Sequence, residues 1–201
     1  MDVEPRRFTA DELRDLDRRA LAVTGGFVAA VTADALAGPT PCEGWTLDVL
    51  LRHMVSHNHG FAAAARGEPA QRSVWEDATL DGDPYATYRS SADEVNAAFA
   101  DDGVLGRKLD IYGYGVFSAP VCFGMHFVDF LVHGWDVARS IGATGEIDDD
   151  LSEAALAVAL RWPYHRPDKA FGVKVDVPDD APAYQRLVAY LGRTPDWHPP
   201  S

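Results

Sequence analysis

The sequence predicts an all-α protein, a four-helix bundle that carries a small C-terminal α/β extension. Apolar residues recur at helical spacing in four long segments, and glycine- and proline-rich breaks separate these segments. Near the end the pattern changes, because residues 171–177 alternate apolar and polar side chains. A chain of 201 residues with 47% hydrophobic residues suits one core with an appendage. We therefore expect a helical bundle over residues 1–165 and a C-terminal extension packed on it over residues 166–201.

The first helix is expected from about Ala10 to about Leu36. Thr9 and Glu12 have the spacing of a capping box at its start. Apolar residues then continue at helical spacing: Leu16, Ala20, Val23, Phe27 and Val31. The proline-rich run over residues 38–45 ends the helix, since proline fixes φ and restricts the residue before it.

The later helices are expected from the same periodicity and from the breaks between them. Thr46 is the natural N-cap of the second helix, and Gly67 stands where a C-terminal glycine would. A glycine-rich loop over residues 103–115 precedes the fourth helix, and residues 171–177 are a short strand or an extended arm. The expected helices after the first are residues 47–65, 85–99, 120–141, 151–162 and 184–191.

The charge and the composition exclude several classes of function. With 18 Lys and Arg against 31 Asp and Glu, the net charge is −13, which would repel nucleic acid and anionic lipid. No apolar run is long enough for a signal peptide or a membrane span, and two cysteines give no disulfide framework. We expect a cytoplasmic protein with metal or small-molecule partners, and a possible homodimer.

The fourth predicted helix carries most of the candidate metal-binding and catalytic side chains. Asp129 and His133 are spaced i, i+4, so their side chains project from adjacent turns and can meet at one ion. Cys122 and His126 share the same narrow stripe of an otherwise apolar helix. Such polar groups must pair with one another, bind a metal or face a cavity.

The second predicted helix offers the further ligand that a metal site needs. It carries three histidines, His53, His57 and His59, and one of them could complete a facial triad of two imidazoles and one carboxylate. The alternative is structural: the histidines are core or surface residues with ordinary hydrogen-bond partners, and Asp129 only orients His133. Residue types and spacing alone leave both interpretations open.

Two motifs resemble a known family. Pro-Thr-Pro-Cys-Glu-Gly-Trp-Thr over residues 39–46 is followed by Leu-Leu-Arg-His ending at His53, and His-x-x-Asp-x-x-x-His-Gly-Trp-Asp-Val-Ala-Arg runs over residues 126–139. Together they are similar to actinobacterial metal-binding proteins of the DinB / mycothiol-dependent maleylpyruvate isomerase superfamily. Residues 187–195 resemble the end of the shorter members of that family.

The resemblance implies a DinB-like four-helix bundle that holds one divalent ion, zinc or else nickel. Carried over by motif, its ligands fall on His53, Asp129 and His133. An aspartate stands here where the isomerase has a glutamate. The isomerase also has a C-terminal domain that helps to bind mycothiol, whereas only the tail from about Asp168 remains here, so the use of mycothiol is left open.

The first functional hypothesis is therefore a metal-dependent enzyme that uses a low-molecular-weight thiol for S-transfer or isomerisation of a small electrophile. His57 and His126 are the candidate proton carriers. The alternatives are a cyclase or hydrolase that uses the metal as a Lewis acid without a thiol, and a non-catalytic metal or small-molecule binding module.

Several other side chains near these motifs have two interpretations. Trp45 and Trp135 are expected to be core anchors. Tyr112 and Tyr114 either gate the pocket or lie in an exposed loop, and Cys122 either lines the ion's pocket or serves as a small buried hydrophobe.

Overall fold

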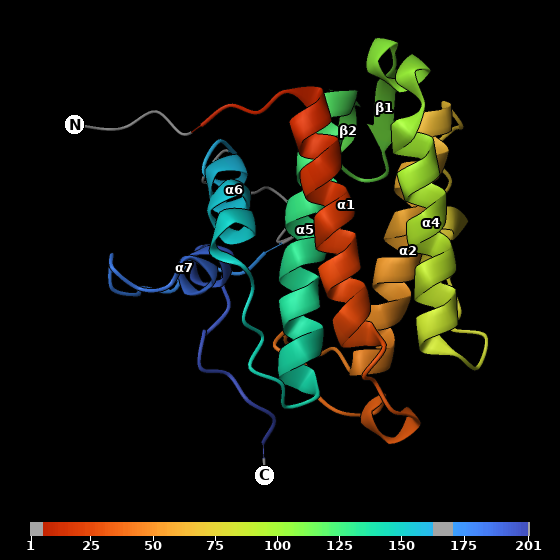
Figure 1. Cartoon of the computed structure of the whole chain (residues 1–201). Helices are drawn as coiled ribbons and strands as arrows, with labels where there is room; N and C mark the ends of the chain where they lie inside the picture. The colour runs from red at the N-terminus through yellow and green to blue at the C-terminus, as the bar shows by residue number, and fades with distance from the viewer. Residues whose placement is uncertain (1–5, 163–170, 201) are drawn as a thin grey trace.

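A bundle of four long helices forms the body of the protein (Figure 1), as the sequence predicts. The computed structural model describes residues 6–162 and 171–200. The bundle consists of α1 (Ala10–Val28), α2 (Leu47–Arg66), α4 (Pro84–Ala100) and α5 (Ala119–Ser140). Helix α1 packs most extensively on α5, and α2 packs on α4. Because α2 also contacts α5, residues 47–66 and 119–140 come together inside the bundle.

The boundaries of α1 and α2 follow from local chemistry. Thr9 caps α1 with a complete capping box, in which its N–H donates to the Glu12 carboxylate at 2.8 Å. Thr46 caps α2, and Gly67 ends it at φ 80°, a left-handed conformation that glycine adopts without a Cβ clash. Both caps agree with the sequence prediction.

The predicted first helix, expected to reach Leu36, is too long. Helix α1 ends at Val28, and only a short 3₁₀ turn, η1 (Ala33–Ala35), follows. The backbone carbonyls of Leu36 and Gly38 instead accept hydrogen bonds from the first residues of α2. These long-range hydrogen bonds reverse the chain and override the helical periodicity of residues 29–36.

Three short elements were not expected from the sequence. They are α3 (Arg72–Glu76), the 3₁₀ helix η2 (Asp102–Gly106) and an antiparallel hairpin of β1 (Lys108–Ile111) and β2 (Gly115–Ser118). The hairpin lies within the segment that its glycines marked as a loop. Gly113, with φ of 78°, lies in the turn between the strands, and Gly115, with φ of 111°, begins β2.

The C-terminal part packs beside the bundle (Figure 1) and contains α6 (Asp149–Ala159) and α7 (Ala183–Tyr190), which contact each other. Residues 171–177 form no strand, although Val175 donates a backbone hydrogen bond to Ala189, so the extended-arm alternative describes them. The predicted boundary between residues 165 and 166 lies outside the described residues. The division into a bundle and an extension stays a prediction.

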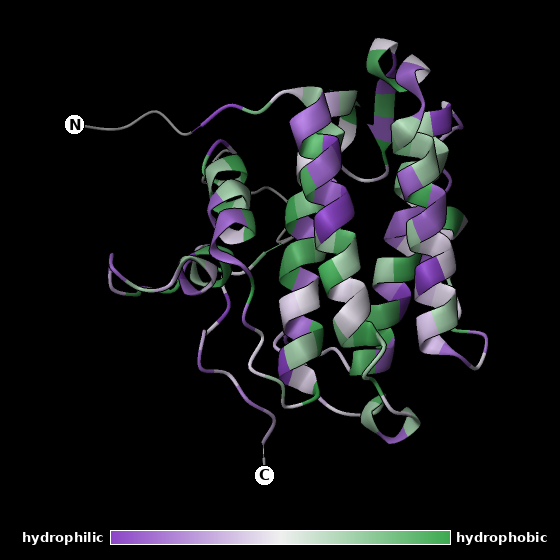
Figure 2. Ribbon diagram, viewed as in Figure 1, coloured by the Kyte–Doolittle hydropathy of each residue, from purple (hydrophilic) through white to green (hydrophobic). Residues whose placement is uncertain are grey.

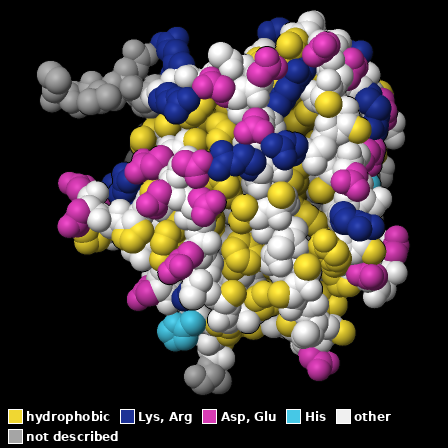
Figure 3. Space-filling model, viewed as in Figure 1, with side chains coloured by type: hydrophobic (Ala, Val, Ile, Leu, Met, Phe, Trp, Pro, Cys, Tyr) yellow, Lys and Arg dark blue, Asp and Glu magenta, His cyan; other side chains and the backbone are white. Residues whose placement is uncertain are grey.

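The core is aromatic along α5, where Phe123, Phe127, Phe130 and Trp135 are fully buried. On the side that faces the viewer, hydrophilic and hydrophobic residues alternate along α1 and α4 (Figure 2), and acidic, basic and hydrophobic side chains are interspersed over this face (Figure 3). Among the described helices none combines the length and apolar character that crossing a membrane requires.

Candidate metal centre

Helices α2 and α5 bring the three predicted ligands together. One ligand atom from each of His53, Asp129 and His133 lies within 4.8 Å of the other two. The Oδ1 atom of Asp129 is 3.5 Å from Nε2 of His133, as the i, i+4 spacing on α5 predicts. The ring of His53, which stands on the facing helix, has its centroid 5.2 Å from that of His133. The structure thus confirms the juxtaposition, while metal binding itself remains a proposal.

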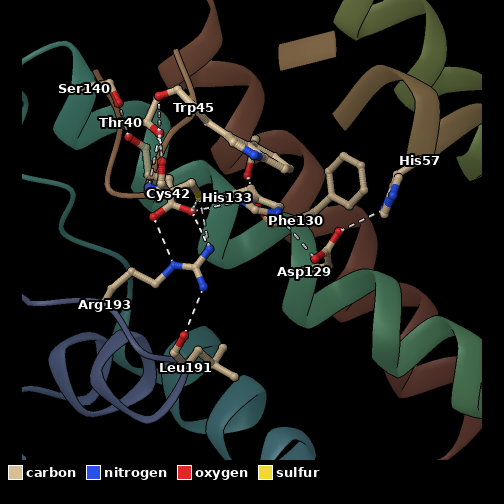
Figure 4. Close-up of polar contacts among 12 residues, drawn as sticks. Thr40, Cys42, Trp45, His57, Asp129, Phe130, His133, Ser140, Leu191 and Arg193 are labelled. Carbon is tan, nitrogen blue, oxygen red and sulfur yellow. Dashed lines mark hydrogen bonds and ion pairs between the residues drawn. The ribbon is translucent and has the colours of Figure 1, made fainter. Parts of the chain in front are cut away.

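Two buried polar atoms beside this cluster lack hydrogen-bond partners. They are Oδ2 of Asp129 and Nδ1 of His57, which lie 3.5 Å apart (Figure 4). Within residues 6–162 and 171–200 only five buried side-chain atoms are unpartnered in this way. A buried carboxylate oxygen without a donor is costly, and a cation at this position would remove that cost. Two imidazoles and one carboxylate also form a donor set that suits zinc and other divalent transition metals. The residues present therefore fit a divalent ion.

The electrostatics of the cluster also suit a cation. Burial, and then the neighbouring His57 and His133, lower the pKa of His53 well below its ordinary value, so this ring is neutral at pH 7. Burial alone would lower the pKa of His133, but the Asp129 carboxylate and the hydrogen bond with Asp136 raise it to about 10. Burial would raise the pKa of Asp129, yet the adjacent histidines hold it far below its usual range. A carboxylate and a neutral imidazole are thus in place, and an ion would compete with one proton on His133.

A second cluster shares His133. The sulfur of Cys42, Nδ1 of His133 and a carboxylate oxygen of Asp136 also lie within 4.8 Å of one another. Here, however, a cation is already present, because the guanidinium of Arg193 lies 2.8 Å from Asp136 and 3.4 Å from the Cys42 sulfur (Figure 4). On the other side of the cluster, Nδ1 of His133 lies 2.9 Å from Oδ2 of Asp136.

A pocket of about 600 Å³ opens beside His53 and His57. Its walls are aromatic and polar and come from α2, α3 and the β-hairpin: Trp45, Val49, Arg52, His53, His57, Trp75, Glu76, Tyr112, Gly113 and Tyr114. The two tyrosines therefore line the pocket. Trp45, expected to be a core anchor, is half-buried and packs against the core, and it also meets the His53 ring edge-on with 4.8 Å between centroids. Trp135 is buried, as expected.

The candidate proton carriers have different surroundings. His57 faces the pocket and Asp129, whereas His126 is fully buried and does not line the pocket. The Nδ1 atom of His126 is 2.7 Å from Asp17 of α1, and Nε2 is 3.1 Å from Asn58 of α2. We therefore keep the proton-carrier proposal for His57 alone.

Two other candidates from the ligand-bearing helices also lie apart from the cluster. His59 pairs with Glu94 at 2.6 Å. Cys122 is fully buried among apolar side chains, and burial raises its pKa to about 12.

Comparison with known proteins assigns the chain to a protein family. The family model described as the mycothiol maleylpyruvate isomerase N-terminal domain matches residues 17–138, more than half of the chain and both helices that carry the cluster. The chain belongs to this family. It is 33% identical over 182 residues to an uncharacterised protein found in two strains of Mycobacterium tuberculosis, which covers 88% of this chain and 95% of the relative.

The fold of this family member has a counterpart among solved structures. The crystal structure of the mycothiol-dependent maleylpyruvate isomerase superposes with a TM-score of 0.56 and 14% sequence identity. The match covers 73% of this chain and 68% of the isomerase. A variant of the same enzyme gives the same values. At this identity the likeness establishes the shared DinB-like fold.

Sequence reasoning missed two groups of residues at the site. Arg193 lies 57 residues beyond Asp136 in sequence, and only its place in the closing motif marked it. The pocket wall formed by Trp75 was missed because α3 has only five residues, too few for a periodic signal.

Proposed function

We propose that this protein is a divalent-metal-dependent enzyme that binds a small electrophilic substrate and uses a low-molecular-weight thiol for S-transfer or isomerisation. His53, Asp129 and His133 would hold the ion, with zinc the first candidate and nickel the second. The observation that carries the proposal is the unpartnered, buried Oδ2 of Asp129 among three histidines at the edge of a pocket of about 600 Å³. Membership of the isomerase family supports the choice of a thiol such as mycothiol.

A bound divalent ion would supply a Lewis acid that lowers the pKa of a thiol or a water molecule. The side chains of the chain itself supply the rest. His57, 3.5 Å from Asp129 and on the pocket wall, is placed to accept a proton from a group near the ion. Arg52 brings a positive charge to the pocket, which suits an anionic group on the substrate. The aromatic walls of Trp45 and Trp75 exclude water from one side.

The same geometry supports a second candidate function, a hydrolase or cyclase that needs no thiol. Its supporting observation is the unpartnered Nδ1 of His57, because an imidazole beside a metal ligand can serve as a general base toward water. A third candidate, a non-catalytic binding module, keeps the ion and the pocket without turnover.

The test measures metal content and turnover of the purified full chain. We expect about one equivalent of zinc or nickel, and thiol-dependent conversion of a small electrophile that chelation abolishes. His133→Ala should lose the ion. His59→Ala, a substitution on α2 at a residue paired with Glu94 outside the cluster, should keep it. Stoichiometric metal in His133→Ala would refute the ligand assignment. Turnover without any thiol would support the hydrolase or cyclase, and metal without turnover would support the binding module.

A further inference from the structure

We propose that Asp136 and Arg193 are positioning residues for His133, so that the C-terminal segment after α7 forms part of the metal centre. The inference rests on the proposed metal site and concerns how that site is built. Its starting point is that the two ring nitrogens of His133 face different partners. Nε2 faces Asp129 at 3.5 Å, on the side of His53, and Nδ1 faces the carboxylate of Asp136 at 2.9 Å.

Asp136 determines which nitrogen of His133 carries the proton. An ionised carboxylate only accepts hydrogen bonds, so Nδ1 of His133 must donate to Oδ2 of Asp136. The lone pair of a neutral His133 ring is then left on Nε2, which is the atom that faces Asp129. This is the carboxylate–histidine arrangement that orients metal-binding imidazoles in general.

Arg193 in turn fixes Asp136. Its Nη2 donates to Oδ2 at 2.8 Å and its Nε donates to Oδ1 at 3.2 Å, so both carboxylate oxygens are engaged by one planar guanidinium (Figure 4). The third nitrogen, Nη1, donates to the backbone carbonyl of Leu191 at 3.0 Å. Arg193 is 7% exposed and Asp136 is 0% exposed, so water does not compete for these bonds.

The local backbone places the guanidinium. Helix α7 ends just before Gly192, whose φ of 85° turns the chain back toward α5. A Cβ at Gly192 would lie 2.4 Å from the backbone of Gly172, so the chain just after α7 packs closely on the extended segment before it. The C-terminal segment therefore delivers Arg193 to the far side of His133 from the pocket.

The same guanidinium decides between the two possible ion sites. Its positive charge lies where an ion held by Cys42 and Asp136 would have to sit. We therefore expect one ion per chain, bound on the Nε2 side of His133 and not on the Nδ1 side.

Asp136→Asn is the sharpest perturbation because it changes no volume. An amide has one accepting oxygen, whereas Asp136 receives hydrogen bonds on both oxygens. If the amide oxygen serves Arg193 Nε, the NH₂ group faces Nδ1 of His133 and favours the tautomer with its proton on Nε2, which leaves no lone pair on the nitrogen that faces Asp129. If the amide is reversed, the NH₂ group meets the Nε–H of Arg193.

The experiment measures Co²⁺ binding to the full chain by visible absorption and by competition with a chelator, and the melting temperature of each metal-free variant. The variants are Asp136→Asn and Arg193→Met, with His133→Ala as the variant that removes a ligand. Arg139→Met is the matched control for Arg193→Met. Arg139 lies on α5, as Asp136 does, and its Nε donates to the Trp197 carbonyl at 2.7 Å, so it anchors the same C-terminal segment without contacting Asp136.

We expect Asp136→Asn and Arg193→Met to bind Co²⁺ about 10- to 100-fold more weakly than the native chain and with an altered spectrum. Arg139→Met should bind Co²⁺ normally even if its melting temperature falls. If Asp136→Asn does not fold, Arg193→Lys, which keeps the charge and loses the planar fork, should show the same weakening.

Three results would overturn the proposal. Native affinity and spectrum in Asp136→Asn and Arg193→Met, with Co²⁺ lost only in His133→Ala, would refute positioning and leave the metal site standing. Equal weakening in Arg139→Met and Arg193→Met would show that detachment of the segment causes the effect. Absence of Co²⁺ binding by the native chain would refute the metal site, and the positioning role with it.

Discussion

The buried pair of Asp17 and His126 should be a major source of stability and should take no part in chemistry. The two side chains are 1% and 0% exposed and lie 2.7 Å apart, and the second ring nitrogen of His126 faces Asn58. Asn58 donates to Ser91, which itself donates to the carbonyl of Tyr88, so the Asn58 amide orientation is fixed and Nε2 of His126 donates to Oδ1 of Asn58.

Asp17→Leu removes the partner of His126 Nδ1 and leaves this buried ring nitrogen without a hydrogen bond. Breaking a buried pair by removing one side costs about 3–5 kcal/mol. In a chain of this size each kcal/mol corresponds to about 2–4 °C in melting temperature, so the expected loss is about 6–20 °C. Urea unfolding followed by circular dichroism measures the free energy directly.

A double variant separates the pair from the cavity that each change creates. His126→Phe suits an aromatic surrounding, since the ring of His126 stacks on Phe130 with centroids 4.1 Å apart. Asp17→Leu combined with His126→Phe should be at least about 1 kcal/mol more stable than the sum of the single changes predicts. Strict additivity, or a loss below about 0.5 kcal/mol for Asp17→Leu, would refute the reasoning. Loss of turnover with metal retained in His126→Phe would restore His126 as a proton carrier.

Three further results are expected. Gly134→Ala should destabilise the chain by about 1–3 kcal/mol in thermal unfolding, because the added methyl group would lie 2.3 Å from the Thr24 hydroxyl. The control Gly26→Ala has open space around its methyl group and should be neutral or stabilising. Equal effects of the two substitutions would contradict this account of the α1–α5 contact. Since the pKa of His133 is raised, metal binding near pH 7 should release about one proton, and the metal affinity should fall as the pH falls. Calorimetry in buffers of different ionisation enthalpy measures the proton release, and the same binding enthalpy in every buffer would contradict it. Because burial raises the pKa of Cys122 to about 12, iodoacetamide should leave it unmodified until the chain unfolds, as peptide mass spectrometry would report; rapid labelling of the native protein would count against its buried setting.

The sequence was sufficient for the cores of the long helices and for the Asp129–His133 pair because both depend on short-range spacing. The i, i+4 relation of Asp129 and His133 survives any arrangement of the bundle, and the caps at Thr9 and Thr46 are local. His53 needed the family resemblance, since its meeting with α5 depends on how two helices pack.

The remaining features depend on contacts between residues that are distant in sequence. Helix α1 stops at Val28 because the next segment hydrogen-bonds to α2, which no periodicity reveals. His126 looks like His133 in sequence, being seven residues earlier on the same stripe, yet Asp17 from α1 satisfies it. Arg193 reaches Asp136 from a segment 57 residues away.

Anomalous diffraction from crystals of the zinc-loaded full chain tests the central claim most directly. We predict one peak at the zinc edge, within about 2.0–2.2 Å of a nitrogen of His53, Nε2 of His133 and a carboxylate oxygen of Asp129. A peak between Cys42 and Asp136, or zinc bound only to surface carboxylates, would contradict the account.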